Sequence, residues 1–415
     1  MQQVLYANVN KVDKKIYFFY VLVFCLSAIN FFSPVVINSS ILLYLYYGLF
    51  LTTTVIIIFN YRNSYHNSFS LPVSLILFAG FLAALNSSYS WEESLYDSFR
   101  GVLPFSSYIL FFLLSAFRFE KKDTEKLILI LGIFFIIVFL FTFAIYPRVL
   151  FGDINQNDET RGFQRIRTDG IGYLFLLSFF SLSEYILKKK ALMLFIYFGT
   201  LTCIIMSLTR TYIIFSILFS LFFILKKSNI FTILCVIAIV AGGFYVITKT
   251  NFYKLMAEET TSQTSDLKND IRMKSVEYYL NYFSPNSVSK FLGNGQANGN
   301  NSYSRFVSIL EQEHGLYISD IGYIGLYIKF GILAILAYLL FIYKTLRKKA
   351  NEQTLYCKYF LLFIFTINII IDSSFNNSFI GSIMISYYIL SFQKSVDDEN
   401  TGLPEITIAT ETWKR

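Results

Sequence analysis

The chain has 415 residues, of which 55% are hydrophobic and only 15% are charged, and its formal net charge is +8. Such a composition excludes an ordinary soluble domain, because too few polar residues remain to cover several buried helices. Continuous apolar runs of about 18 residues recur along the chain, whereas the strands of a membrane β-barrel would alternate apolar and polar residues. We therefore predict an all-α polytopic membrane protein in which residues 1–415 form a single integral membrane domain.

Twelve apolar segments predict transmembrane helices. The first follows three lysines and lacks a small-residue cleavage site after it, so it predicts a retained helix and not a secretory signal. The third and eighth segments are short, which predicts helices that are tilted poorly, broken or re-entrant. In chain order the segments are 16–33, 41–59, 72–86, 99–117, 126–146, 171–187, 191–208, 211–225, 230–248, 320–343, 356–371 and 378–393.

The basic residues predict the orientation of these helices. With the N-terminus inside, 21 of the 35 lysines and arginines fall in inner links or in the tail, 394–415. The short outer links 34–40, 87–98 and 372–377 hold none. By the positive-inside rule both termini are cytoplasmic, and the loops 147–170 and 249–319 face the periplasm of a bacterium. The net charge then reflects topology and does not indicate a nucleic-acid partner.

The four cysteines predict neither a disulfide framework nor a zinc site. Three lie inside apolar runs and the fourth lies in a basic link, so none faces an oxidising compartment. They are Cys25, Cys203, Cys235 and Cys357.

Arginines are the first candidates for chemistry. The outer loop 147–170 carries the run R-G-F-Q-R-I-R, which contains Arg161, Arg165 and Arg167. Guanidinium groups form paired hydrogen bonds with phosphate oxygens, so the cluster indicates a phosphate-binding loop. An ordinary solvated surface is the alternative.

Arg210 lies between two apolar runs, at or just below the outer membrane face. A charge at that depth is costly and is usually paired or functional. We favour a ligand of phosphate or pyrophosphate, and the alternative is an arginine that extends from a helix end towards water.

The large loop 249–319 ends in Glu311-Gln312-Glu313-His314. If these residues are helical, Glu311 and His314 share one face. A carboxylate beside an imidazole suits a general base acting on a sugar hydroxyl. The alternatives are an exposed loop histidine and a metal site, although two or three ligands do not make such a site. The Asn/Gly-rich stretch 293–304 predicts a flexible outer segment.

Two charged residues follow the loop. Asp320 is placed to cap the helix that returns into the membrane. Lys329 lies further along the same helix, within the outer leaflet, where it either extends to the interface or meets an anionic head group. The sequence favours neither alternative.

Three motifs lie, in this order, on the predicted outer side. S-L-T-R-T at 207–211 is similar to S-x-[ST]-R-[TG], with Thr209 where serine is commoner, and F-L-G-N-G at 291–295 is similar to [LI]-x-G-x-G. E-H-G-L-Y-I-S-D-I-G-Y-I-G-L-Y-I-K-F-G at 313–331 is similar to H-x-x-[YL]-L followed by G-[IL]-[IL]-G. With about twelve spans and two outer loops, the chain resembles the O-antigen polymerase (Wzy) and O-antigen ligase superfamily. These are bacterial inner-membrane glycosyltransferases of GT-C-like architecture.

The resemblance implies transfer of a glycan from undecaprenyl pyrophosphate to an acceptor sugar hydroxyl, without a metal or other cofactor. Arg210 and one or more of the loop arginines would stabilise the departing pyrophosphate. His314 or a neighbouring glutamate, Glu311 or Glu313, would orient or deprotonate the acceptor, and Asp320 and Lys329 would help to bind substrate. The implied partners are the lipid-linked donor and acceptor, membrane lipids and a chain-length regulator.

Other functions remain open. O-antigen ligases, which transfer the polymer to a lipid-A core, often have His-Asn where this chain has His314-Gly315, so a polymerase of repeat units is favoured. A lipid-linked oligosaccharide flippase would place polar groups at the membrane midplane on broken helices, and here the midplanes are nearly free of charge. A structural or polysaccharide-export component is the last alternative.

Overall fold

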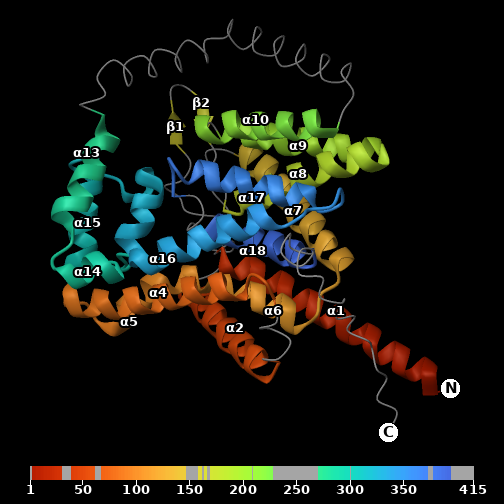
Figure 1. Ribbon diagram of the computed structural model, residues 1–415, viewed down its shortest axis with the longest axis horizontal. Helices are drawn as coiled ribbons and strands as arrows, with labels where there is room; N and C mark the ends of the chain where they lie inside the picture. The colour runs from red at the N-terminus through yellow and green to blue at the C-terminus, as the bar shows by residue number, and fades with distance from the viewer. Residues whose placement is uncertain are drawn as a thin grey trace, which may run out of the picture.

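The computed structural model describes residues 2–29, 39–60, 67–145, 158–160, 163–165, 169–207, 209–227, 270–299, 301–372 and 377–393. Within these ranges the chain is almost entirely helical, as the composition predicts (Figure 1). An antiparallel hairpin of β1 (Asp158–Thr160) and β2 (Phe163–Arg165) is the exception. The helices of the first half are α1 (Gln2–Ala28), α2 (Ser39–Phe59), α4 (Ser70–Ser90), α5 (Leu95–Val102), the 3₁₀ helix η1 (Leu103–Ile109), α6 (Leu110–Ala116), α7 (Lys121–Ile145), α8 (Ile171–Lys188), α9 (Ala191–Met206) and α10 (Arg210–Lys227).

The second half contains shorter helices before the last three long ones. They are α13 (Ile271–Tyr278), the π-helix η4 (Tyr279–Phe283), α14 (Ser287–Leu292), α15 (Ser302–Gln312), the 3₁₀ helix η5 (Ile318–Ile321), α16 (Gly322–Arg347), α17 (Leu355–Ile367) and α18 (Asn377–Ser391).

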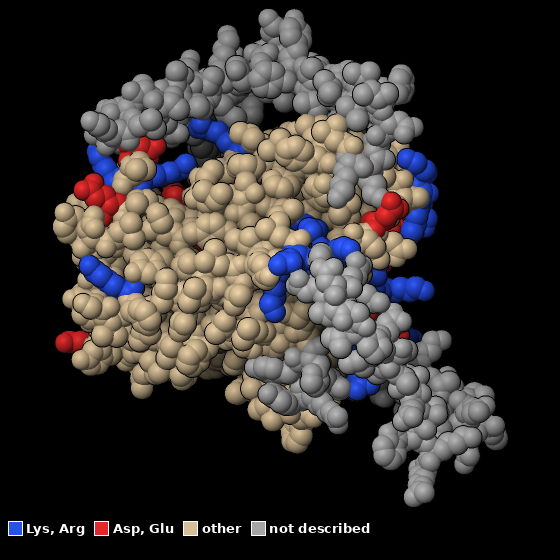
Figure 2. All heavy atoms as spheres, viewed as in Figure 1, with Lys and Arg blue, Asp and Glu red and all other residues tan. Residues whose placement is uncertain are grey.

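Five helical stretches of the described chain are long and apolar enough to cross a membrane, which indicates a membrane protein. On the face drawn in Figure 2, charged side chains gather at the left edge and in the right half, with an uncharged surface between them. The longer helices run between these two charged regions (Figure 1). The five stretches are Ser70–Ser90, Leu95–Ala116, Lys121–Ile145, Ile171–Lys188 and Ile318–Arg347.

The prediction of a short, irregular third segment was wrong, and the eighth segment does form one of the shorter apolar helices. The third segment is an uninterrupted helix of 21 residues, α4, because its polar end, including Asn86 and Ser87, stays helical where it is buried against other parts of the chain. The fourth segment is interrupted by η1 at Pro104, and α16 is interrupted at Gly331. The eighth segment is the 18-residue helix α10. The ninth predicted segment, 230–248, lies outside the described residues.

The centre of the bundle is formed by α18 and the first half of α8 (Figure 1). Every residue of α18 from Ser378 to Leu390 is buried. A helix that is surrounded by protein has no polar face, and α18 accordingly combines apolar residues with small serines and glycine. Its neighbours are α8, α17, α6 and η1.

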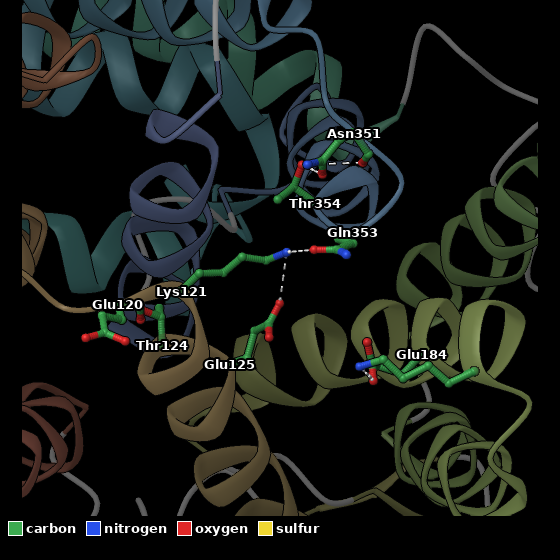
Figure 3. Close-up of polar contacts among 9 residues, drawn as sticks. Glu120, Lys121, Thr124, Glu125, Glu184, Asn351, Gln353 and Thr354 are labelled. Atoms are coloured by element: carbon green, nitrogen blue, oxygen red, sulfur yellow. Dashed lines mark hydrogen bonds and ion pairs between the residues drawn. The ribbon is translucent and has the colours of Figure 1, made fainter. Parts of the chain in front are cut away.

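Several links that the charge pattern predicts to lie inside do lie together at one end of the bundle, which we call the lysine end. Lys14 Nζ is 2.5 Å from Glu120 Oε1, and the hydroxyl of Tyr388 donates to the carbonyl of Phe119. Lys121 Nζ lies 2.9 Å from Gln353 Oε1 and 3.5 Å from Glu125 Oε1 (Figure 3). Residues far apart in sequence therefore meet at this end.

The opposite end carries α13, α14 and α15, which lie beside the first part of α16 and the last part of α4 (Figure 1). Their aromatic side chains form a second small core around Tyr279, Phe283 and Tyr303. Trp91, which follows α4, stacks on Tyr303 with ring centroids 4.5 Å apart. This packing fixes the shorter helices on the bundle, and we call this region the α16 end.

Candidate functional site

The break in α16 organises the α16 end. Gly331 has φ 73° and ψ −170°, so the carbonyls before it lose their intrahelical partners. The segment after α14 replaces those partners. The backbone N–H groups of Asn294 and Gly295 donate to the carbonyls of Ile328 and Lys329, at 2.9 and 2.8 Å, and the Asn294 amide also donates to Ile328. The F-L-G-N-G motif is therefore a clamp on the broken helix.

Glycine is required on both sides of this clamp. A Cβ on Gly293 would lie 2.5 Å from the carbonyl oxygen of Lys329, and one on Gly331 would overlap the carbonyl oxygen of Phe291. Both residues also have positive φ, which disfavours larger side chains. The prediction of a flexible segment at 293–304 was wrong, because Asn294 is fully buried and α15 already begins at Ser302.

Lys329 forms a buried ion pair immediately before the break. Its Nζ lies 2.7 Å from Oδ2 of Asp372, and the two side chains are only 16% and 3% exposed. Asp372 follows α17, and its backbone N–H donates to the carbonyl of Ser319 in η5. Lys329 therefore does not extend to the interface, because a charge buried this deeply needs a partner and Asp372 provides it. Contact of Lys329 with an anionic head group stays a prediction.

The second carboxylate oxygen of Asp372 has no hydrogen-bond partner among the described residues, although it is buried. A buried acceptor without a donor costs free energy, and such atoms are uncommon in folded proteins. A bound molecule that donates a hydrogen bond to Oδ1 would therefore remove this cost.

Glu311 belongs to the same electrostatic group. It is half-buried at the end of α15, and burial is the main cause that raises the pKa of its carboxyl. The charge of Lys329 and a hydrogen bond from the backbone of Ile318 oppose the rise, while the charge of Asp320 adds to it. We call Glu311, Asp320, Lys329 and Asp372 the α16 charge cluster.

Asp320 does not cap α16, contrary to the prediction. The chain forms the 3₁₀ turn η5 before the helix, which moves the cap position to Ile321, a residue without a capping side chain. Asp320 is half-buried within this turn, and it acts on Glu311 through its charge.

The proposed pairing of Glu311 with His314 is not formed. α15 ends at Gln312, and Gly315 turns the chain with φ 68°, so the two residues do not share a helix face. Glu313 and His314 are exposed, and the side chains of both make no hydrogen bond or ion pair with the rest of the described chain. His314 therefore faces solvent while Glu311 faces the cluster.

Arg210 is the first residue of α10 and is half-exposed. α10 packs mainly on α17, with fewer contacts to α8 and α9, and it does not pack closely on α15, the helix that carries Glu311. Arg165 lies in β2, where its backbone pairs with Asp158. Arg161 and Arg167 lie outside the described residues.

A second buried carboxylate, Glu93, lies between α4 and α5 and is 6% exposed. Its Oε2 accepts hydrogen bonds from Ser87 and Ser98, at 2.8 and 3.2 Å, and its Oε1 accepts one from the amide of Asn301. Burial raises the pKa of Glu93, and the three donors oppose the rise. Since Asn301 also caps α15, Glu93 holds α4, α5 and α15 together.

Sequence reasoning missed both Glu93 and Asp372. Each is an acidic residue in a short link that was predicted to be outer and contains no lysine or arginine. Acidic residues in short links without any lysine or arginine are the signal that would have drawn attention to them.

Comparison with known proteins gives no relative, because no protein-family model, no curated protein and no solved structure matches the chain. Within the part of the chain that the structure describes, no group of three or more histidine, cysteine or carboxylate residues has the arrangement of a metal site. The functional argument therefore depends on the geometry of the α16 end and on the motifs in the sequence.

Proposed function

We propose that this protein polymerises undecaprenyl-pyrophosphate-linked repeat units into O-antigen or capsular-type polysaccharide at the periplasmic face of a bacterial inner membrane. The observation that supports it is the α16 charge cluster, which gathers a buried ion pair and two half-buried carboxylates at one end of an apolar bundle. Buried charges in membrane proteins are costly and usually serve substrates.

The charge pattern supports the proposed orientation. The links at the lysine end carry Lys14, Lys121, Lys344 and Lys348, and the positive-inside rule assigns such links to the cytoplasm. The α16 end then faces the periplasm, where it meets the pyrophosphate and the first sugars of a lipid-linked glycan.

The cluster offers suitable groups for glycosyl transfer. The ammonium of Lys329 would pair with a pyrophosphate oxygen, and the free oxygen of Asp372 would accept a hydrogen bond from a sugar hydroxyl. Glu311, whose pKa is raised by burial, would take the proton of the acceptor hydroxyl as its oxygen attacks the anomeric carbon. The bond to the pyrophosphate breaks in the same step, and the pyrophosphate departs on its lipid.

Other residues would complete this site from solvent and from neighbouring elements. His314 is exposed beside Glu311 in sequence and would orient the acceptor. Arg210 and the arginines of 161–167 would stabilise the negative charge of the departing pyrophosphate, in the role that a metal ion has in other transferases.

Deletion of the gene tests the proposed function. A lipid-A core that carries a single repeat unit would support a polymerase. A core without repeats, while polymer accumulates on its lipid carrier, would indicate a ligase instead. A lipid-linked precursor trapped on the cytoplasmic face would indicate a flippase, and unchanged polysaccharide would contradict all three.

Arg210→Ala tests the proposed pyrophosphate ligand. We expect loss of long-chain polysaccharide on a gel at an unchanged protein level. Arg305→Ala is the control, because Arg305 is exposed on α15 at the same end of the bundle. A normal ladder for Arg210→Ala would remove this residue from the site.

A further inference from the structure

A cavity of about 200 Å³ lies between the α5–η1 region and the segment that follows the clamp. No predicted site residue lines it. Its apolar wall includes Ala28, Leu103 and Pro104, and its polar groups belong to Tyr46, Arg100, Gln296, Asn298 and Asn377.

One wall of this cavity, residues 296–298, is held at both ends. Before it, the N–H of Gly295 donates to Lys329 and its carbonyl accepts from the hydroxyl of Tyr303, at 3.3 Å. After it, the Asn301 amide donates to the carbonyl of Asn298, at 3.1 Å. The wall therefore keeps its shape without a ligand, which reduces the entropic cost of binding.

The opposite wall is fixed as well. The hydroxyl of Tyr46 lies 2.9 Å from Oγ of Ser107 and 3.1 Å from Oγ of Ser106, which joins α2 to η1. At Gly101 the α5 backbone contacts the carbonyl oxygen of Gln296, so no larger side chain fits between the two walls. The cavity is thus a built feature of the fold.

The polar groups define the chemistry of a ligand. Each of the three carboxamides offers a donor and an acceptor, which matches the neighbouring hydroxyls of a sugar. The guanidinium of Arg100 forms no ion pair with any described acidic residue, so it is free for an anionic group. The cavity has the volume of roughly seven water molecules, which is smaller than the pockets that bind drug-sized ligands. A cavity of this size suits one sugar ring.

We propose that this cavity, the Arg100 pocket, binds one anionic sugar residue, with Arg100 pairing with its charged group. That this sugar belongs to the lipid-linked glycan rests on the proposed polymerase function. The segment 293–298 joins the pocket to the α16 charge cluster, because it contacts Lys329 at one end and lines the pocket at the other. A repeat unit bound in the pocket would therefore contact the same segment that holds the proposed reaction site.

Cysteine protection tests the pocket in the purified full-length chain. Ala297→Cys places a thiol in the pocket wall, in a background with Cys235→Ser. The remaining cysteines, Cys25, Cys203 and Cys357, are buried and should react slowly with a maleimide. The labelling rate is then measured with glucuronic acid, glucose or inorganic pyrophosphate at millimolar concentrations.

We expect glucuronic acid to slow the labelling of the introduced thiol severalfold and glucose to slow it less. When Arg100→Ala is combined with Ala297→Cys, the two sugars should slow labelling equally. The same charge removal in Lys290→Ala, an exposed residue outside the pocket, should leave protection intact. Protection by pyrophosphate alone, or equal protection with and without Arg100, would overturn the proposal.

Polysaccharide analysis separates this proposal from the proposed function. If gene deletion removes the polymer but Arg100→Ala leaves its length and amount normal, the pocket has no role in polymerisation. If deletion leaves the polymer unchanged, the polymerase proposal fails, and the labelling experiment still decides whether the pocket binds a sugar.

Discussion

One exposed and one buried ion pair distinguish the two ends of the bundle. At the lysine end the Lys14–Glu120 pair is exposed, with side chains 61% and 60% accessible, and Lys188 pairs with Glu184 within the last turns of α8. At the α16 end the Lys329–Asp372 pair is 16% and 3% accessible, and Glu93 is buried among three donors.

This difference in exposure determines what each pair contributes to stability. Exposed ion pairs contribute little to stability, because water already solvates their charges. Buried pairs lose that solvation, and replacing one by apolar residues is often neutral or stabilising. The lysine end also has a buried charge, Lys348, but its ammonium donates to the backbone carbonyl of Gln393. The α16 end instead keeps a buried ion pair that stability alone does not require, which agrees with a role of this pair in binding or chemistry.

The largest effect is expected for Gly331→Ala. The new Cβ would overlap the Phe291 backbone at a residue with positive φ, so we expect a loss of about 5 kcal/mol or more, enough to prevent stable folding. Gly48→Ala is the control, because no described heavy atom lies within 4 Å of its added Cβ, and alanine should stabilise α2 slightly. Thermal unfolding in detergent measures both. Equal stability of the two variants would contradict the clamp on the broken helix.

Lys329→Ala should have the next largest effect, about 3–5 kcal/mol, because it leaves the carboxylate of Asp372 buried and unpaired. The double variant Lys329→Met with Asp372→Leu should recover most of this stability, since it removes both charges and keeps apolar packing. If the double variant is less stable than the single one, the pair is not the source of the loss.

A smaller effect is expected from the titration of Glu93. Burial raises the pKa of Glu93 in the folded chain above its value in the unfolded chain. Its favourable contribution to the free energy of unfolding is therefore complete below the unfolded-state pKa, and it is lost as the pH rises through the folded-state pKa. Relative to Glu93→Gln, the wild-type chain should therefore gain stability as the pH falls from neutral towards 4. A difference in melting temperature that is constant with pH, or that changes in the opposite direction, would show that burial does not dominate at this carboxyl.

The smallest effect is expected at the lysine end. Removal of the exposed pair by Lys14→Ala and Glu120→Ala should leave the melting temperature unchanged, because both groups are solvated when unpaired. A loss comparable to that of Lys329→Ala would remove the contrast between the two ends.

The sequence predicted the helices better than their irregularities. Continuous apolar runs define the segments, but they do not show that the polar residues after Ala84 continue α4, because that depends on burial against residues 286–293. Pro104 interrupts the fourth segment and is visible in the sequence. The break at Gly331 depends on a clamp from a distant motif, which no local pattern predicts.

The site was predicted in part. Glu311, Asp320 and Lys329 were each named as candidates, but the sequence placed Glu311 in a different group from the other two, and the structure gives them a common electrostatic environment. Asp372 was missed, because it lies 43 residues from its partner Lys329 and is brought there by the fold. His314 was expected to work with Glu311, but the end of α15 separates them.

The most direct test of the account is the polysaccharide made by a deletion strain that carries the Lys329→Met, Asp372→Leu double variant. At a protein level equal to wild type, we predict single repeat units and no long polymer, whereas the Lys14→Ala, Glu120→Ala variant should restore the full ladder. A full ladder from the double variant would show that the buried charges of the α16 end are structural and that the reaction takes place elsewhere.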